Sequence, residues 1–171
     1  MQVPTEYISE NRLRHTVATL ADTVAKDIDN DWVVLVLLRG SFIFAADFVR
    51  ELARQSVYPS IDFMNLQSYH QGTESNGVKV TAEPAESIKN KSVLILDDIF
   101  DTGLTMSAAI TYCQKQQAKK IKSMVLFEKP SRRVMDLEIN YAGLTIENKF
   151  IVGYGLDYAN RYRSLPYIAV I

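Results

Sequence analysis

The sequence predicts an α/β fold in which a mainly parallel, twisted sheet is flanked by helices. Two runs, residues 32–38 and 92–98, are rich in Val, Leu and Ile, and each leads into polar residues at its end. Continuous apolar runs of this kind are typical of strands buried on both faces. Each run is followed by a turn and a helix-like segment, and strands that alternate with helices build parallel sheets. A length of 171 residues favours one domain, since domains usually hold roughly 100–200 residues.

An amphipathic helix is expected at the start of the domain. From Ser9, which can cap a helix N-terminus, apolar residues recur at spacings of three and four: Leu13, Val17, Leu20, Ala21, Val24 and Ile28. The run at 32–38 then forms a central strand that ends at Arg39 and Gly40. Ser41 can cap a second helix, which is expected to reach about Gln55.

The middle of the chain continues the alternation of strands and helices. A strand is expected at 61–69, and the polar, glycine-containing segment 70–77 has no period and predicts an exposed, mobile loop. Further strands are expected at 78–82, at 92–98 and at 121–127. A helix that ends near Gln117 separates the last two strands.

The last forty residues lack a helical period and predict a small subdomain built from short strands. The apolar residues that indicate these strands are Ile139, Ile146, residues 150–152 and residues 168–171.

Composition excludes several classes of protein. Lys and Arg number 19 against 20 Asp and Glu, and the chain holds only seven Gly and five Pro, so neither a disordered nor a collagen-like chain is expected. The single Cys113 cannot form an intramolecular disulfide, which suggests a reducing compartment. No apolar run approaches the roughly 20 residues of a spanning helix, and the acidic N-terminus does not read as a secretory signal. We therefore expect a cytoplasmic protein with no membrane partner.

The strongest site signal lies where the second apolar run meets its helix. The strand delivers Asp97 and Asp98, and the segment 101–105 (Asp-Thr-Gly-Leu-Thr) then enters the helix. Ligands of open α/β sheets bind at the carboxyl ends of strands, and a helix N-terminus offers N–H groups to a phosphate. The alternative is that Asp101 and Thr102 only cap the helix.

Two nucleotide-binding interpretations fail on their motifs. A magnesium-dependent nucleotide hydrolase would need a G-x-x-x-x-G-K-[ST] loop, which the sequence lacks. The segment 153–158 begins like a dinucleotide fingerprint, but it lacks the third glycine and a following helical period.

The segment 92–105 closely resembles the phosphoribosyl-diphosphate (PRPP) binding motif of the type I phosphoribosyltransferases. Four further segments are similar to those of the hypoxanthine-guanine phosphoribosyltransferases: 38–42 (Leu-Arg-Gly-Ser-Phe), 68–69 (Ser-Tyr), 129–133 (Lys-Pro-Ser-Arg-Arg) and 149–158 (Lys-Phe-Ile-Val-Gly-Tyr-Gly-Leu-Asp-Tyr). The resemblance covers about residues 32–171. It implies the type I phosphoribosyltransferase fold, with a core at about 30–135 and a hood formed by the N-terminal segment and about 136–171.

The resemblance implies purine salvage, in which the 5-phosphoribosyl group of PRPP moves to N9 of hypoxanthine or guanine and gives IMP or GMP and pyrophosphate. In this family Asp101, Thr102, Gly103, Leu104 and Thr105 would bind the 5′-phosphate. Asp97 and Asp98 would hold the ribose hydroxyls, directly or through hydrated Mg²⁺, because hydroxyls need acceptors and a diphosphate leaving group needs a divalent cation. Asp101 would also act as general acid/base at purine N7.

The resemblance implies that pyrophosphate binds to the backbone of Arg39 and Gly40 and to the side chain of Arg163. Arg39 and Gly40 would offer backbone N–H groups next to a non-proline cis peptide, although the family usually has Lys where this chain has Arg39. Arg163 would bind pyrophosphate through a guanidinium that matches phosphate oxygens. Asp157 would ligate a second Mg²⁺ and also border the purine.

The purine is assigned to residues near the end of the chain. Lys129 would donate to the 6-oxo group, Phe150 would stack on the ring, and the Ile151 main chain would meet the exocyclic edge. Without the resemblance, a lone Lys is usually a solvated charge and an aromatic in an apolar run is usually core. Ser68 and Tyr69 would belong to a lid loop that excludes water from the reacting ribose.

A second hypothesis is an RNA-binding regulator on the same fold, of the pyrimidine attenuator type. Residues 115–133 carry seven basic residues and one acid, which motivates it. The enzyme is the preferred interpretation, because Asp101 suits purine N7 and the basic segment can be a solvated helix face with ligand contacts. We therefore expect PRPP and a 6-oxopurine as small-molecule partners, no nucleic acid, and the homodimer or homotetramer of the family.

Overall fold

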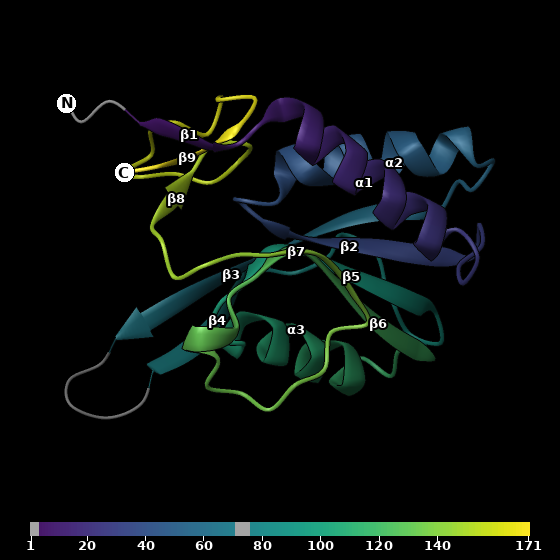
Figure 1. The fold of residues 1–171 in the computed structure, drawn as a ribbon. Helices are drawn as coiled ribbons and strands as arrows, with labels where there is room; N and C mark the ends of the chain where they lie inside the picture. The colour runs from purple at the N-terminus through teal and green to yellow at the C-terminus, as the bar shows by residue number, and fades with distance from the viewer. Residues whose placement is uncertain (1–3, 71–75) are drawn as a thin grey trace.

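A six-stranded sheet lies at the centre of the computed structural model, which describes residues 4–70 and 76–171, without the side chains of residues 68–70 and 76. The strands in sheet order are β4 (Asn76–Ala82), β3 (Ser60–His70), β2 (Trp32–Leu38), β5 (Ser92–Phe100), β6 (Lys120–Glu128) and β7 (Tyr141–Thr145). Every neighbouring pair is parallel except β3 and β4. The predicted α/β fold with a mainly parallel sheet is confirmed (Figure 1).

Helices cover both faces of this sheet (Figure 1). Helices α1 (Glu10–Val24) and α2 (Phe42–Arg54) pack on one face, against Val34, Leu94 and Leu96. Helix α3 (Leu104–Lys115) packs on the other face, against Leu35 and Ile95. Successive residues of β2 and β5 therefore enter different cores, which explains why both strands are apolar without alternation.

The two predicted helix caps have different outcomes. Ser9 caps α1 as expected, since its hydroxyl accepts a hydrogen bond from the Arg12 backbone N–H at 3.3 Å. Ser41 precedes α2, but its backbone is already helical and its side chain makes no capping bond. Its hydroxyl donates instead to the Leu37 carbonyl oxygen at 2.6 Å and lies 3.1 Å from a carboxylate oxygen of Asp97. The capping prediction for Ser41 was wrong, because a capping side chain needs an extended backbone.

A second, three-stranded antiparallel sheet joins the two ends of the described chain. It consists of β1 (Thr5–Ile8), β9 (Ile168–Val170) and β8 (Ile151–Val152), in that order. Figure 1 shows it beyond the carboxyl ends of the main strands, where a hood is expected. Strand β7 does not belong to it, because Tyr141–Thr145 pairs with β6 in the main sheet. The three-stranded sheet and the segment between β8 and β9 are called the hood below, and the expected division of the chain into a core at about 30–135 and a hood subdomain stays a prediction.

The short strands of the C-terminal region were only partly located by sequence. Ile139 and Ile146 flank β7 rather than lying in strands. The sequence of β7, Tyr-Ala-Gly-Leu-Thr, has no apolar run, and its edge position beside β6 decides its structure. The expected strands at 150–152 and 168–171 are present as β8 and β9, each slightly shorter than predicted.

The loop predicted for 70–77 is shorter than expected. His70, Asn76 and Gly77 lie in β3 and β4, where antiparallel pairing joins His70 to Asn76 and Tyr69 to Gly77. Polar residues are tolerated there because β4 is an edge strand with few buried positions. Residues 71–75 lie outside the described residues, and so do the side chains of Ser68 and Tyr69, so the lid loop remains a prediction.

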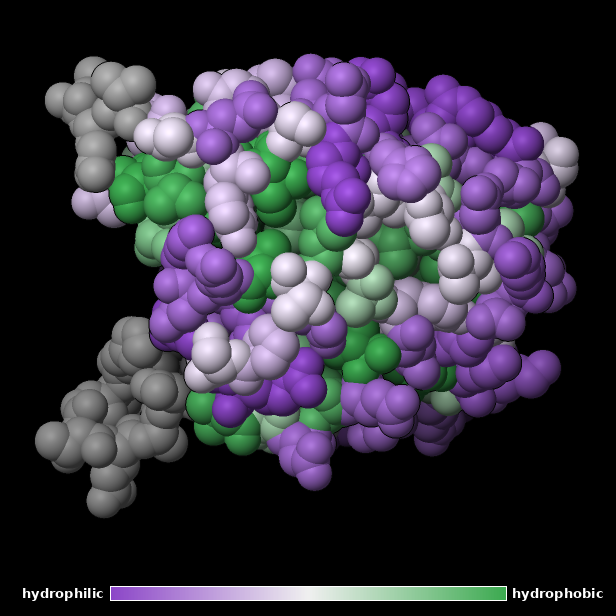
Figure 2. Space-filling model, in the orientation of Figure 1, coloured by the Kyte–Doolittle hydropathy of each residue, from purple (hydrophilic) through white to green (hydrophobic). Residues whose placement is uncertain are grey.

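Hydrophilic residues cover most of the face shown in Figure 2, with a hydrophobic group near the three-stranded sheet. None of the described helices combines the length and apolar character that crossing a membrane requires.

A half-buried carboxylate acceptor ties β3 to the connection that leads into β5. The Asp62 carboxylate accepts hydrogen bonds from the backbone N–H groups of Phe63, Ala85 and Glu86, at 2.7, 3.1 and 3.1 Å. Partial burial alone would raise the pKa of Asp62, but these donors hold it below the ordinary value of 3.8. Asp62 therefore stabilises the fold in its ionised form.

We expect Asp62→Asn to lower the free energy of unfolding at pH 7 by about 1 kcal/mol, since bonds to a partly exposed carboxylate are weakened by solvent. A pKa lowered by folding gives stability above pH 3.8 that is lost as the pH falls through the lower native value. In thermal melts the difference from the wild type should therefore shrink below pH 3.8. Asp31→Asn, at an exposed position before β2, is the control, and matching pH profiles of the two variants would contradict the prediction.

Candidate active site

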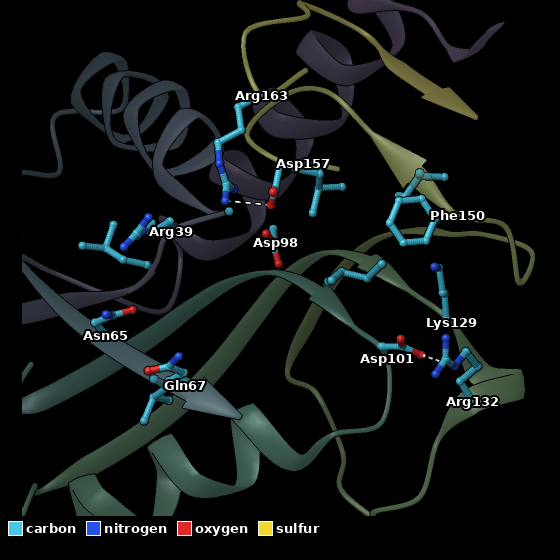
Figure 3. A pocket seen from close by; sticks show the side chains of 16 residues that line it. Arg39, Asn65, Gln67, Asp98, Asp101, Lys129, Arg132, Phe150, Asp157 and Arg163 are labelled. Atoms are coloured by element: carbon cyan, nitrogen blue, oxygen red, sulfur yellow. Dashed lines mark ion pairs between the residues drawn. The ribbon is translucent and has the colours of Figure 1, made fainter. Parts of the chain in front are cut away.

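A cleft of about 580 Å³ lies between the carboxyl ends of the main strands and the hood (Figure 3). Its walls come from β2, β3, β5 and the residues that follow β5 and β6 below, and from the segment 150–163 above. A second cavity of about 320 Å³ adjoins it over residues 97–106. Both cavities are lined by Gly40, Asp98 and Asp101, so they form one continuous candidate site.

Two adjacent carboxylates stand near the end of β5. The strand continues to Phe100, so Asp97 and Asp98 lie within it rather than after it. Asp97 is buried, and this burial together with the neighbouring Asp98 charge raises its pKa well above the usual range. Burial also raises the pKa of Asp98 to about 6, while the Arg163 guanidinium opposes that shift. Two carboxylates in so little water form a place that favours a cation or hydroxyl donors.

Two glycines allow the hood to touch the floor of the site. The peptide bond between Leu38 and Arg39 is cis, as the resemblance implies. A Cβ on the next residue, Gly40, would lie 1.6 Å from a carboxylate oxygen of Asp98. A Cβ on Gly155 of the hood would lie 1.9 Å from the Gly40 carbonyl oxygen. The backbone at 38–40 is therefore held between Asp98 below and the hood turn above.

The segment 101–105 forms the turn into α3. Gly103 has a φ of +89°, which favours glycine, and Leu104 begins the helix. The Leu104 N–H donates to the Thr102 hydroxyl at a long 3.4 Å. Gly103 occupies the N-cap position and has no side chain that could cap the helix. Thr102, Gly103 and Thr105 line the smaller cavity. The first-turn N–H groups of α3 thus remain available to an anion, and only Thr102 has any capping contact.

Asp101 lies where the two cavities meet. Its Oδ1 is buried and, among the described residues, accepts no hydrogen bond. Arg132 Nε lies 3.2 Å from this oxygen, so the two side chains form an ion pair without hydrogen-bond alignment (Figure 3). Asp101 Oδ1 is therefore free to accept a hydrogen bond from a group that enters the cleft. A role in helix capping alone would not explain this unsatisfied oxygen.

The other end of the cleft combines a cation with an exposed ring. Lys129 is buried just past β6, and its ammonium donates to the Lys149 carbonyl oxygen at 2.7 Å. Burial lowers the pKa of Lys129, and the Asp101 charge partly offsets that effect. Phe150 is 56% exposed, which is unusual for an aromatic beside a strand. Its ring and that of Tyr158 pack in a T-shaped arrangement, with 5.7 Å between the ring centroids. Figure 3 shows Phe150 and Lys129 together, with Ile151 following at the start of β8.

The hood also brings an ion pair to the end of the cleft that holds Asp98. Arg163 Nη2 lies 2.7 Å from Asp157 Oδ1, and Arg163 Nη1 donates to the Gly155 carbonyl oxygen at 2.7 Å. In Figure 3 this pair stands near Asp98 and on the side of Arg39. The cleft thus has one end with an exposed ring and an ammonium, and another with two guanidiniums and two carboxylates.

Three polar residues that line the cleft were missed by the sequence analysis. Asn65 and Gln67 reach the cleft from β3, and Arg132 pairs with Asp101. Polar residues two apart in a strand share a face, and that period could have revealed Asn65 and Gln67. Arg132 stood in a quoted motif, but its pairing depends on how the 3-10 turn Pro130–Arg132 folds back toward β5.

The acidic residues fit a cation that takes part of its ligands from a substrate. Asp97, Asp98 and Asp157 are oxygen donors of the kind that Mg²⁺ prefers. Among the residues that the structure describes, no three His, Cys, Asp or Glu side chains gather closely enough to hold an ion by themselves. Mg²⁺ usually binds through one or two carboxylates together with substrate phosphates, so this donor set is compatible with it.

Residues 7–159 match the family described as phosphoribosyl transferase domain. The chain is 37% identical over 166 residues to hypoxanthine-guanine phosphoribosyltransferases of Staphylococcus epidermidis and Staphylococcus aureus, with coverage of 96% of this chain and 91% of each relative. A solved hypoxanthine-guanine phosphoribosyltransferase of Bacillus anthracis superposes with a TM-score of 0.91, at 37% identity over 99% of both chains. A hypoxanthine phosphoribosyltransferase of S. aureus gives 0.90, at 36% identity over 97% of this chain and 90% of the other.

We expect Gly155→Ala to lower the free energy of unfolding by about 2–3 kcal/mol, because the new Cβ would meet the Gly40 carbonyl oxygen and the φ of +104° disfavours a side chain. Denaturant unfolding measures the change. Ser164→Ala, at an exposed position of the same turn, is the control. Equal midpoints for the two variants would show that the turn does not depend on this contact.

Proposed function

Since the chain belongs to the phosphoribosyltransferase family, we propose that it is a purine salvage enzyme that transfers the 5-phosphoribosyl group of PRPP to N9 of hypoxanthine or guanine. The products are IMP or GMP and pyrophosphate. Fold and family agree, because the relatives that it matches over most of its length are type I enzymes of this activity. It is therefore a glycosyltransferase of the hypoxanthine-guanine class.

The observation that carries this proposal is the chemical division of one cleft. A flat base needs a stacking surface and a hydrogen-bond donor, and Phe150 and Lys129 stand together at one end. A ribose carrying phosphates needs acceptors and cations, and Asp98 with Arg163 stands at the other end. Asp101 borders both cavities, which is where the reacting base and ribose would meet.

At the base end, Lys129 donates to the 6-oxo group and Phe150 stacks on the purine. The Lys129 ammonium already gives one hydrogen to the Lys149 carbonyl, which fixes its direction and leaves hydrogens for a ligand. The Ile151 main chain and Asp157 are assigned to the remaining edge of the purine, and both line the same cleft.

At the phosphate end, the turn 101–105 takes the 5′-phosphate on the N-terminus of α3. The unsatisfied first turn and the cavity above Thr102, Gly103 and Thr105 support this role. Arg163 and the backbone at Arg39 and Gly40 take the diphosphate, which a guanidinium can bind through two oxygens. Asp97 and Asp98 take the ribose hydroxyls.

We assign Mg²⁺ as the cofactor, held by Asp97 and Asp98 on one side and by Asp157 on the other. When bound, it would neutralise the charge that develops on the departing diphosphate. The raised pKa values of Asp97 and Asp98 support this assignment, because two adjacent carboxylates that are poorly hydrated gain from a counter-charge.

In the reaction, the bond between N9 and ribose C1′ forms while the bond from C1′ to the diphosphate oxygen breaks. The base must lose a proton as N9 becomes bonded, and Asp101 exchanges that proton at N7. The buried, unbonded Oδ1 of Asp101 supports this role, since an acceptor is present where the ring nitrogen would lie. Ser68 and Tyr69 are assigned to a lid that keeps water from the ribose.

The RNA-binding alternative has no support in these observations. The relatives reported above are named as enzymes, and parts of the basic segment have other contacts, such as Lys122 with Asp27 and Lys129 with the Lys149 carbonyl. A cytoplasmic location and a homodimer or homotetramer stay predictions.

A steady-state assay with PRPP, Mg²⁺ and each 6-oxopurine tests the function. We expect turnover with hypoxanthine or guanine, because the base end offers a donor to a 6-oxo group, and loss of turnover when EDTA removes the cation. Adenine, which has an amino group at this position, is the control base. Equal turnover of adenine would contradict the role of Lys129, and no turnover of any purine would contradict the function.

We expect Asp101→Asn to lower kcat by about 10²–10⁴-fold, since an amide cannot exchange the proton, while the KM for PRPP stays nearly unchanged. Thr105→Ser is the matched control in the same turn and keeps a hydroxyl. Unchanged turnover in Asp101→Asn would remove the proton-transfer role and leave only a positional one.

A further inference from the structure

The turn at residues 153–156 of the hood, called the hood turn here, directly precedes Asp157 and has an unusual backbone. Gly153, Tyr154 and Gly155 have φ values of +101°, +50° and +104°, so a tyrosine lies in the left-handed region between two glycines. A bulky residue adopts that conformation only where its surroundings impose it. The turn is fixed from outside by hydrogen bonds from the Tyr154 N–H to the Leu165 carbonyl and from the Gly155 N–H to the Arg163 carbonyl, both at 2.9 Å.

The Tyr154 side chain points away from the substrate cleft. As far as the described residues show, it lines a separate groove of about 460 Å³ with Arg14 and Val17 of α1 and Ile43 of α2, while its neighbours Leu156 and Asp157 line the cleft. Tyr154 is 7% exposed, and its hydroxyl donates to Asp47 Oδ2 at 2.5 Å. Burial and the Asp47 charge raise the pKa of Tyr154, so it stays a donor at neutral pH.

Asp47 connects this hydrogen bond to the floor of the site. It lies on α2, and α2 begins at Phe42, directly after Gly40 and Ser41. The backbones of Gly155 and Gly40 are in direct contact on the cleft side of the turn. The Tyr154 to Asp47 bond lies on the other side of the same turn. The hood and the segment 38–41 are thus held together from two sides, and Ser41 in turn contacts Asp97.

We propose that Tyr154 is a positioning residue, whose hydrogen bond to Asp47 keeps the hood turn against Gly40 and thereby sets where Arg163 and Asp157 lie over the phosphate end. This inference rests on the transfer reaction proposed above. Tyr154 touches no substrate, and it acts through Arg163, whose guanidinium is bonded to the carbonyl of Gly155. Displacing the turn would move the diphosphate contacts and leave Phe150 and Lys129, which lie at the other end, in place.

Tyr154→Phe removes the hydroxyl and keeps the ring. We expect the KM for PRPP to rise about tenfold, because a hydrogen bond to a charged, half-exposed acceptor is lost from the element that binds diphosphate. The KM for hypoxanthine should rise less than the KM for PRPP, because Phe150 and Lys129 stay in place and only Asp157 among the assigned purine contacts follows the turn. The dissociation constant of Mg²⁺-pyrophosphate, measured by calorimetry without purine, should rise in parallel with the KM for PRPP.

Tyr141→Phe is a closely matched control. Tyr141 is 8% exposed, its hydroxyl donates to Asp27 Oδ2 at 2.5 Å, and Asp27 is paired with Lys122 at 2.8 Å, just as Asp47 is paired with Arg50. It lies at the start of the edge strand β7, opposite Met124 in the middle of β6, and it lines neither of the two cavities of the candidate site. This variant should lose a comparable amount of thermal stability without any change in the KM for PRPP.

Asp47→Asn tests the other partner and keeps an acceptor oxygen, so a smaller rise in the KM for PRPP is expected. The KM for PRPP of the double variant Tyr154→Phe/Asp47→Ala should be no higher than that of Asp47→Ala alone, because both substitutions remove the same contact.

An unchanged KM for PRPP in Tyr154→Phe, or an equal rise of this KM in Tyr141→Phe, overturns the inference. If Tyr154→Phe does not fold, the pair Asp47→Asn and Tyr141→Phe decides by the same criterion. A wild type without transferase activity refutes the proposed function instead, and pyrophosphate affinity still tests the positioning.

Discussion

The placement of two adjacent carboxylates near the end of β5, the buried Asp97 and the half-buried Asp98, is the constraint on which the rest of the site depends. Asp97 and Asp98 lie next to each other in a strand that is packed on both faces, and their raised pKa values reflect that lack of water. The neighbouring segments respond to them: Gly40 leaves room for Asp98, Ser41 approaches Asp97, and Arg163 of the hood supplies a positive charge. The floor and the hood are therefore organised around the same negative charge.

The sequence predicted what local chemistry decides. The buried strands at 32–38 and 92–98, helix α1 with its Ser9 cap, and the turn into α3 were found because each depends on an apolar period or a turn residue within a few positions. It could not predict what distant segments decide. Strand β7 exists because β6 offers an edge, Ser41 turns away from its helix toward Leu37 and Asp97, and Arg132 meets Asp101 only after the chain folds back.

For the candidate site the same distinction holds. Most of the predicted cleft residues could be named through a resemblance because they stand in contiguous motifs, whereas Asn65 and Gln67 stand in none and were missed. The division of the cleft into a ring-and-ammonium end and an end with guanidiniums and carboxylates required the hood to be placed over the sheet, since Phe150 and Lys129 come from different elements. The contact of Tyr154 with Asp47 joins positions 107 apart in the sequence and belongs to no motif, so only the three-dimensional structure shows it.

The hood sheet places β9, near the end of the chain, between β1 and β8. During synthesis on the ribosome, β1 emerges first and then waits for its partner until residues 168–170 have left the exit tunnel. The main sheet can assemble earlier, since β7 ends at Thr145. A nascent chain can thus form the main sheet before the hood sheet is complete. Truncated products that lack β9 would keep the main sheet but would lose the strand that pairs with both β1 and β8.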